Sequence, residues 1–111
     1  MSRFTDDIAL MQALARLDAI EAEMRRIGLW GDTAPDPDAL ASVMPFCYDT
    51  LLFHEWLQWV FLPRMREVFQ RGESLPAACV IHPLAEHSFA ELPHPTDALL
   101  ALIDQFDRFM A

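Results

Sequence analysis

Apolar residues recur every three or four positions along most of this chain, which is the spacing of one buried face on an α-helix. The first such stretch covers residues 5–27, with Thr5 placed to cap its start and Gly28 placed to cap its end. Its apolar stripe comprises Ile8, Leu10, Met11, Leu14, Ala15, Leu17, Ile20 and Met24. The pattern predicts a long amphipathic helix.

A second helical pattern occupies the middle of the sequence. A turn-rich connection leads to Asp36-Pro37-Asp38, which could cap a short helix over Ala39–Ser42. From about Thr50 to Gln70 the apolar spacing is again helical, but Pro63 lacks an amide hydrogen and clashes with the carbonyl group four residues before it. The pattern therefore predicts a helix that kinks or breaks at Pro63 and terminates at Gly72.

The C-terminal third is divided by prolines. Residues 77–81 could be extended or helical, a short helix is predicted over Leu84–Phe89, and a last helix over Pro95–Phe109. The last helix is expected to bury Leu99, Leu102, Ile103, Phe106 and Met110, with Asp104, Asp107 and Arg108 on its polar face. The sequence thus predicts an all-α fold for residues 1–111, a single-domain irregular bundle of three main helices plus short ones.

The central stretch also contains the strongest candidates for a site. Its helix is apolar on nearly all sides, so its few polar residues must find partners if they are buried. Asp49, Glu55, Gln58 and Arg64 are expected either to form one buried polar network, with Arg64 as the strong donor, or to line a binding pocket. As a third possibility, these four polar residues form a solvent-exposed strip.

Two tryptophans lie among these polar residues. Trp56 and Trp59 are three positions apart, so a regular helix would place both rings on one face. Large aromatic rings are typical of a core, and they are also typical of an apolar groove that accepts a ligand or a partner helix. The spacing alone does not separate these two interpretations.

No pattern in the sequence indicates a cofactor, a metal site or a catalytic group. Cys79, His82, Glu86, His87 and His94 superficially resemble metal ligands, but structural zinc sites use two or more closely spaced cysteines. Cys47 or Cys79 could meet a histidine, although no local motif favours such a pair. The sequence also contains no glycine-rich phosphate-binding loop.

The charge of the chain narrows the class of partner. The net charge is −9, and the acids lie in the flanks, whereas residues 48–72 balance three acids with three arginines. A nucleic-acid-binding surface needs clustered cations, so direct binding of RNA or DNA is not expected. The acidic faces either keep a small helical protein soluble or steer a basic protein partner towards it. With two cysteines, an acidic N-terminus and no apolar run long enough to span a membrane, the sequence predicts a cytoplasmic protein.

One run of the central stretch resembles a known family. Pro45-Phe46, Asp49-Thr50, Glu55-Trp56-Leu57-Gln58-Trp59-Val60 and Pro63-Arg64-Met65 resemble the YqcC-like family of small bacterial proteins, and Leu75-Pro76 and His94-Pro95 fit the same pattern. This resemblance implies an all-helical bacterial protein without a known activity, described through an association with tRNA pseudouridine synthase C. It suggests an accessory role in tRNA modification, and it gives Asp49 no catalytic role.

These observations lead to a ranked set of functional hypotheses. The first is a non-enzymatic helical module that binds a protein partner, connected with tRNA modification. The alternative is a small-ligand-binding bundle in which Trp56, Gln58, Trp59 and Arg64 surround an apolar pocket. An unrecognised hydrolase is the third hypothesis, and it requires a cleft that pairs Cys or His with a carboxylate.

Overall fold

The regular elements are helices throughout the part of the chain that the computed structural model describes, residues 7–44, 47, 49–72 and 80–110. In chain order they are α1 (Asp7–Arg26), α2 (Pro37–Leu40), α3 (Phe53–Trp56), the π-helical segment η2 (Leu57–Phe61), α4 (Leu62–Arg71), α5 (His82–Phe89) and α6 (Asp97–Met110). The three segments between residues 53 and 71 follow one another without a loop and are called the central helix below. In these residues three long helical stretches, α1, the central helix and α6, and two short helices, α2 and α5, confirm the predicted all-α bundle.

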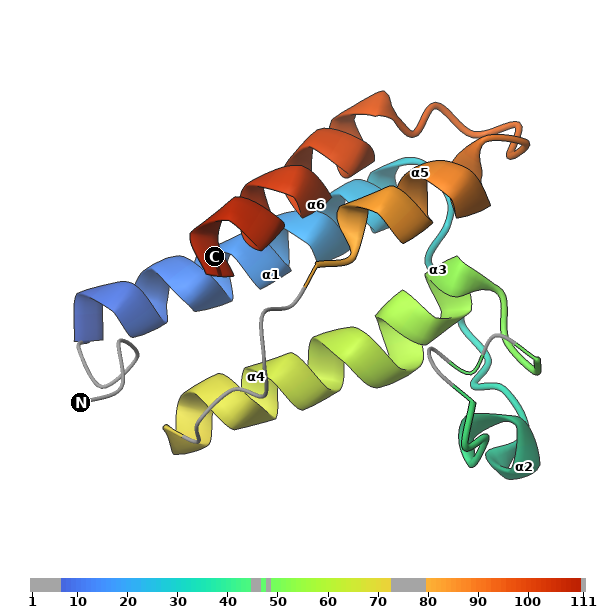
Figure 1. Ribbon diagram of the computed structural model, residues 1–111, viewed down its shortest axis with the longest axis horizontal. Helices are drawn as coiled ribbons and strands as arrows, with labels where there is room; N and C mark the ends of the chain where they lie inside the picture. The colour runs from blue at the N-terminus through green and yellow to red at the C-terminus, as the bar shows by residue number, and fades with distance from the viewer. Residues whose placement is uncertain (1–6, 45–46, 48, 73–79, 111) are drawn as a thin grey trace.

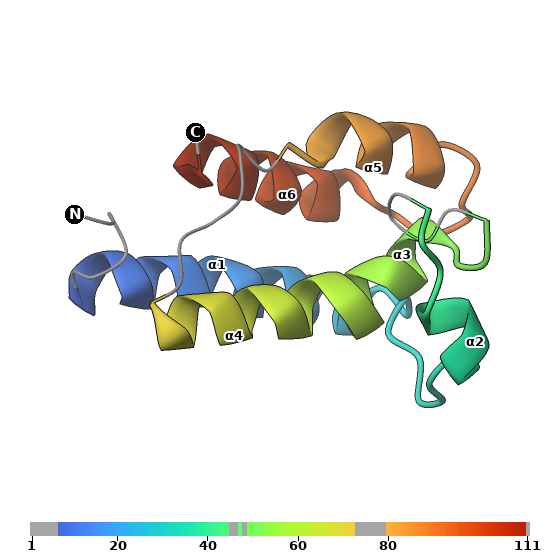
Figure 2. The same cartoon turned by 60° about the horizontal axis from the view of Figure 1, so that its bottom comes forward.

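The long helices form two layers. Figure 1 shows the central helix and α6 on either side of α1, and Figure 2 shows α1 beside the central helix with α5 and α6 above them. Both α6 and the central helix run antiparallel to α1 (Figure 1). The connection between Gly31 and Thr50, which contains α2 and is called the α2 segment below, projects in its described residues from the end of the central helix where α3 begins (Figure 1). The molecule measures 40 × 30 × 24 Å along its principal axes.

The end of α1 follows from its sequence. Gly28 adopts a left-handed backbone conformation with φ of 83°, which glycine reaches without a steric penalty. The N–H of Gly28 donates to the carbonyl of Arg25, and the N–H of Leu29 donates to that of Met24, completing a Schellman motif. The predicted C-cap is therefore confirmed, whereas Thr5 lies outside the described residues.

The buried face of α1 differs from the predicted stripe at its N-terminal end. Ile8 and Met11 are 66% and 69% exposed, and Ala13 is fully buried instead. Leu17, Ile20 and Met24 are fully buried as expected. The buried face of α1 therefore passes through Ala13, and the wider apolar stripe predicted from hydrophobicity was wrong at Ile8, Met11 and Ala15, which are exposed.

The irregularity predicted at Pro63 is a π-helical segment placed directly before it. The N–H of Leu62 donates to the carbonyl of Leu57, five residues earlier, where a regular α-helix would use the residue four positions back. In a regular helix the ring of Pro63 would meet the carbonyl of Trp59. The wider π turn lets the helix continue through Pro63, and it ends as predicted at Gly72, whose φ is 67°.

The shorter helices are displaced from their predicted limits. The central helix begins at Phe53 instead of Thr50, and α2 begins at Pro37 and ends at Leu40 instead of covering Ala39–Ser42. Helix α5 begins at His82, two residues earlier than expected, and α6 begins at Asp97. Val80 and Ile81 are not helical, while residues 77–79 of the ambiguous stretch lie outside the described residues.

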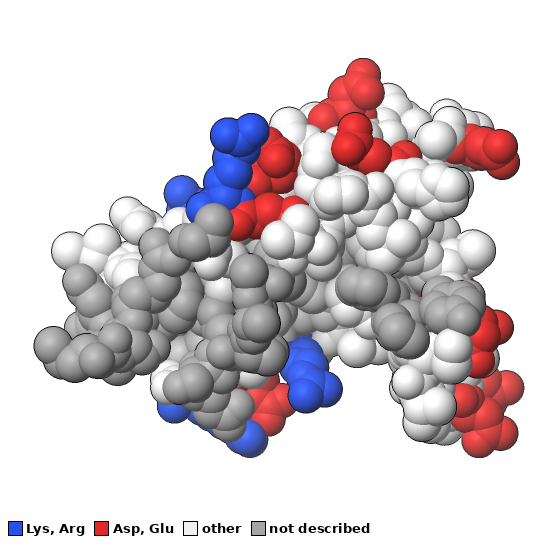
Figure 3. Space-filling view, viewed as in Figure 1, with Lys and Arg blue, Asp and Glu red and all other residues white. Residues whose placement is uncertain are grey.

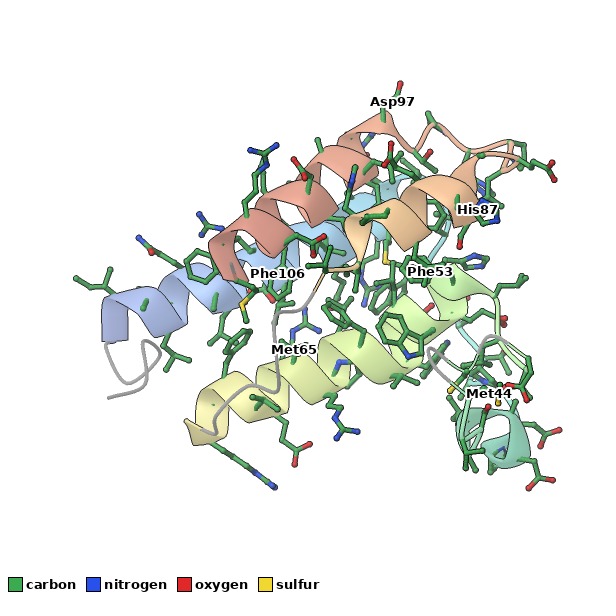
Figure 4. All side chains as sticks on the ribbon, in the orientation of Figure 1. Met44, Phe53, Met65, His87, Asp97 and Phe106 are labelled. Atoms are coloured by element: carbon green, nitrogen blue, oxygen red, sulfur yellow. The ribbon has the colours of Figure 1, made fainter. Side chains whose placement is uncertain are left out.

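Aromatic side chains connect the two layers. The ring of Phe106 in α6 meets those of Phe61 and Phe69 edge to face, with centroids 5.7 and 6.5 Å apart, and Phe53 meets Phe89 of α5 at 5.6 Å. Figure 4 shows Phe53, Met65 and Phe106 between the central helix and the helices above it. Edge-to-face pairs add to the stabilisation from burial, so these contacts hold the central helix to α5 and α6.

One acidic residue occupies a place that the sequence pattern did not indicate. Asp107 was expected on the polar face of the last helix, but it is only 8% exposed. Its carboxylate accepts the backbone N–H of Ile81 at 2.9 Å and that of His82 at 2.7 Å. Asp107 therefore caps the N-terminus of α5 from α6, and a carboxylate suits the positive end of the helix dipole.

Candidate functional site

Gln58 fixes the connection after α1 to the central helix. It is 5% exposed, its Oε1 accepts the N–H of Gly31 at 2.8 Å, and its Nε2 donates to the carbonyl of Gly31 at 2.6 Å. Both polar ends of the buried amide are thus satisfied by one residue. Gln58 does not line an open pocket, and its role is to hold the connection that leads to α2.

Asp49 and Glu55 have other partners. The hydroxyl of Ser42 donates to Asp49 at 2.6 Å, and the hydroxyl of Thr50 donates to the carbonyl of Ala39 at 2.7 Å. Glu55 accepts the N–H of Leu52 at 2.8 Å and so caps the start of the central helix. The single network expected of Asp49, Glu55, Gln58 and Arg64 is therefore wrong: the first three make separate local contacts.

The two tryptophans do not share one environment. Trp56 stacks on Phe53 with ring centroids 5.6 Å apart and meets Phe61 at 5.2 Å. Trp59 lines an open groove on the other side of the central helix. The π-helical turn begins directly after Trp56, and its different angular step separates two residues that a regular helix would place together.

The groove containing Trp59 is the candidate site. Its volume is about 490 Å³, within the range of roughly 300–1,000 Å³ common for binding sites. It is lined by Leu40 of α2 and by six residues from one face of the central helix: Trp59, Val60, Pro63, Arg64, Glu67 and Val68. The contacts of Gln58, Asp49 and Thr50 hold the α2 segment beside this face, so they position one wall of the groove.

Arg64 provides the positive charge of the groove. It is exposed, and within the described ranges it makes no hydrogen bond, ion pair or cation–π contact. Glu67, the acid of the groove, forms a solvent-exposed ion pair with Arg71 at 2.9 Å. Arg64 itself makes no ion pair within the described ranges. Of Gln58 and Arg64, the two polar residues expected to open onto a groove, only Arg64 lines this one.

The surroundings of the groove are acidic. Figure 3 shows acidic side chains over the α2 end of the molecule and along the edge formed by α5 and α6. The exposed acids of the α2 segment are Asp32, Asp36, Asp38 and Asp49. The same segment exposes Val43 almost completely and Met44 in part, and Figure 4 places Met44 beside α2. The groove thus lies between an acidic, partly apolar segment and the face of the central helix that carries Arg64 and Glu67.

A second, smaller pocket lies between α3 and α5. Its volume is about 270 Å³, and its lining is mainly apolar: Leu51, Leu52, Phe53, His54, Leu84, Ser88, Phe89 and Leu92. Burial lowers the pKa of His54; Glu55 raises it in part, and His94 lowers it further. The imidazole is therefore held in its neutral form at neutral pH.

The lowered pKa of His54 predicts a pH dependence of stability. An unfolded chain takes up a proton at His54 near pH 6.5, whereas the folded chain does so only at lower pH. The free energy of unfolding should therefore fall as the pH drops below about 7 and level off below the pKa of the folded state. Urea unfolding at about pH 7.5 and about pH 5.5 measures this fall. His54→Gln should reduce this difference in unfolding free energy, whereas His87→Gln, at an exposed position, should not. An equal difference in the two variants would contradict the assignment to His54.

The other residues considered for chemistry are not gathered into a site. Cys47 is buried as a free thiol, and Cys79 lies outside the described residues. In the described ranges, no three His, Cys, Asp or Glu residues are grouped as metal ligands. His82 pairs instead with Glu86 one turn along α5. None of the helices in these ranges is both long enough and apolar enough to cross a membrane.

Comparison with known proteins identifies the family. Residues 12–109 match the model of the DUF446 family, which is described as tRNA pseudouridine synthase C. The chain belongs to this YqcC-like family. It is 37% identical over 97 residues to the uncharacterized protein YqcC of Escherichia coli K12, a match covering 86% of this chain and 88% of YqcC. It is 34% identical over 92 residues to an uncharacterized protein of Haemophilus influenzae, covering 83% and 87%.

The fold of the family is also known from a solution structure. The NMR structure of E. coli YqcC superimposes on this chain with a TM-score of 0.80 and 34% identity, covering 93% of this chain and 88% of YqcC. A third relative is larger. The tRNA pseudouridine synthase C of Pectobacterium carotovorum is 42% identical over 57 residues, which are 51% of this chain but only 15% of that protein.

Proposed function

We propose that this chain is a non-catalytic accessory protein that associates with the tRNA pseudouridine synthase C of its own cell. The observation that carries the proposal is the Pectobacterium relative, in which a segment similar to this chain makes up 15% of a protein named as that synthase. Most of that protein lies outside the match. Two modules that form one chain in one organism are expected to associate when another organism makes them as separate chains.

The physical basis is the effective concentration that a covalent connection creates. Two modules on one chain meet at millimolar effective concentration, so a modest interface is sufficient to keep them together. Such interfaces within a chain resemble transient protein–protein interfaces in size and polarity. An exposed groove with apolar walls and one cation, as found beside Trp59, has the composition of such an interface.

The charge of the chain supports a protein partner over the tRNA itself. With a net charge of −9, the chain would be repelled by the phosphate backbone, whereas RNA-binding proteins present clustered cations. An acidic protein is instead steered towards a basic surface, and an enzyme that binds tRNA must have one. The accessory chain would bind beside that surface.

Reconstitution tests the proposal. The purified chain is mixed with the synthase encoded in the same genome, at about physiological salt, and the mixture is examined by size-exclusion chromatography with light scattering. A complex with the summed mass of the two chains is expected. Separate elution of the two proteins at concentrations up to about 50 µM would rule out an association of useful strength.

A second function is favoured by the pocket between α3 and α5. Its apolar lining and its neutral, half-buried His54 suit a small apolar ligand with one hydrogen-bonding group. A ligand bound only by the folded chain raises the melting temperature, so thermal shift against a metabolite library tests this function. A melting temperature that no compound raises would count against it.

A further inference from the structure

Arg64 differs from the other arginines that the structure describes. Each of those contacts an acidic, carbonyl or aromatic group: Arg16, Arg25, Arg26, Arg66, Arg71 and Arg108. Arg64 lacks such a contact in the described part of the chain, although it lies within an acidic molecule. An acidic protein that leaves one guanidinium unpaired in a groove has a place for an anion from outside.

The residues around Arg64 are those of a protein-binding surface. Trp59 and Arg64 are residue types enriched among the positions that contribute most to binding energy. Val60, Pro63 and Val68 surround them with apolar surface. A partner that covers this surface would exclude water from the groove and so strengthen a charge pair formed there. The floor belongs to one helix and the wall, Leu40, to the fixed α2 segment, so the groove is formed before a partner arrives.

We propose that this groove binds a segment of the synthase that places an apolar side chain against Trp59 and a carboxylate against Arg64. The inference rests on the proposed function and names its surface. Guanidinium and carboxylate groups match in geometry and form paired hydrogen bonds. Asp36 and Asp38 lie exposed in the segment that forms the wall, so basic residues of the partner would flank its carboxylate.

A phosphate of tRNA could also pair with an arginine, but the charges of this face oppose it. Glu67 lines the groove, and the exposed Asp36 and Asp38 lie close in sequence to Leu40 of its wall. One unpaired arginine does not supply the several cations that RNA binding requires. A carboxylate on a segment with its own basic residues meets no such opposition. The protein segment is therefore the occupant that the charges favour.

The experiment measures the affinity of the purified synthase for variants of the full chain by biolayer interferometry. Arg64→Glu should weaken binding by about 10- to 100-fold, because it places two carboxylates together. Arg64→Lys, which keeps the charge but not the paired hydrogen bonds, should lose much less. Arg108→Glu is the matched control: it makes the same charge change at an exposed position on α6 and should change the affinity by less than about two-fold.

The possible outcomes distinguish a wrong partner from a wrong binding surface. If wild type does not bind the synthase, the proposed function fails and this inference fails with it. If wild type binds and Arg64→Glu binds as well as Arg108→Glu, the function stands and the groove is not the surface. If the isolated chain binds tRNA in fluorescence anisotropy and Arg64→Glu abolishes that binding, Arg64 is an RNA contact and the inference is overturned. Arg64→Ala, with unchanged melting temperature, repeats the test without a new charge.

Discussion

Replacing Asp107 by Ala is expected to lower the free energy of unfolding by about 2–3 kcal/mol. Its carboxylate is 8% exposed and accepts the N–H groups of Ile81 and His82 at 2.9 and 2.7 Å. They belong to the N-cap residue and the first residue of α5, whose N–H groups have no partner within the helix. Alanine would leave them without an acceptor in a place that water reaches poorly, so α5 would lose its attachment to α6.

The measurement is urea unfolding followed by circular dichroism, with two further variants. Asp107→Asn retains one acceptor oxygen and should fall between Ala and wild type. Asp104→Ala removes an acid from the same helix whose partner is the exposed Arg108, so it should cost less than about 0.5 kcal/mol. Equal stability of Asp107→Ala and Asp104→Ala would show that the cap contributes nothing.

Gln58→Ala is expected to cost about 1–2 kcal/mol and to loosen the wall of the groove. The side chain exchanges two hydrogen bonds with the backbone of Gly31, at 2.8 and 2.6 Å. The cost is smaller than at Asp107 because Gly31 is exposed and water can replace the lost partners. The stabilisation of α2 by this contact is indirect, through the connection between Gly31 and Pro37.

Urea unfolding gives the cost, and amide hydrogen exchange reports on the wall. In Gln58→Ala the amides of Ala39, Leu40 and Ala41, which are bonded within α2, should exchange faster than in wild type. Gln70→Ala, at an exposed position of the same helix, is the control and should change neither quantity. Unchanged exchange in α2 would mean that Gln58 does not position the groove.

The helices were predictable because local signals agree with the packing. Gly28 and Gly72 end their helices in left-handed conformations, as glycines following a run of apolar spacing are expected to do. The limits of α2 and α5 were less certain because each is short and its start depends on a proline and on distant contacts. Helix α5, for example, begins where Asp107 of another helix receives its N–H groups.

The polar residues of the central helix show what sequence spacing cannot supply. Of Asp49, Glu55 and Gln58, only Gln58 is buried and needs its partner for that reason. The partners of the three are Ser42, the backbone N–H of Leu52 and Gly31. The contacts of Asp49 and Gln58 depend on how the connection from Gly31 to Thr50 packs against the central helix, and no periodic pattern in the sequence records this; the contact of Glu55 is a local helix cap. The separation of Trp56 from Trp59 likewise depends on the π turn, for which Pro63 was the available sign.

Asp107 was missed for a related reason. It adjoins Arg108 in the sequence and follows Asp104 by three positions, so it was assigned to the solvated face together with them. A buried acid is recognisable from sequence only when its donor is nearby, and here the donors precede it by 26 and 25 positions. The His82-Pro83 start of α5, which lacks a serine, threonine or aspartate cap of its own, was the one available signal that a cap had to come from elsewhere.

The indole of Trp59 lies in the groove through which the chain is proposed to bind tRNA pseudouridine synthase C. The most direct measurement is the NMR spectrum of the isotope-labelled chain during titration with unlabelled synthase, read at its tryptophan indole N–H signals. The account predicts that the Trp59 signal shifts or broadens first, while Trp56, which is packed on Phe53 and Phe61, and Trp30, which is stacked with Arg25, change little. A spectrum unchanged by excess synthase, or changes confined to α5 and α6, would contradict it.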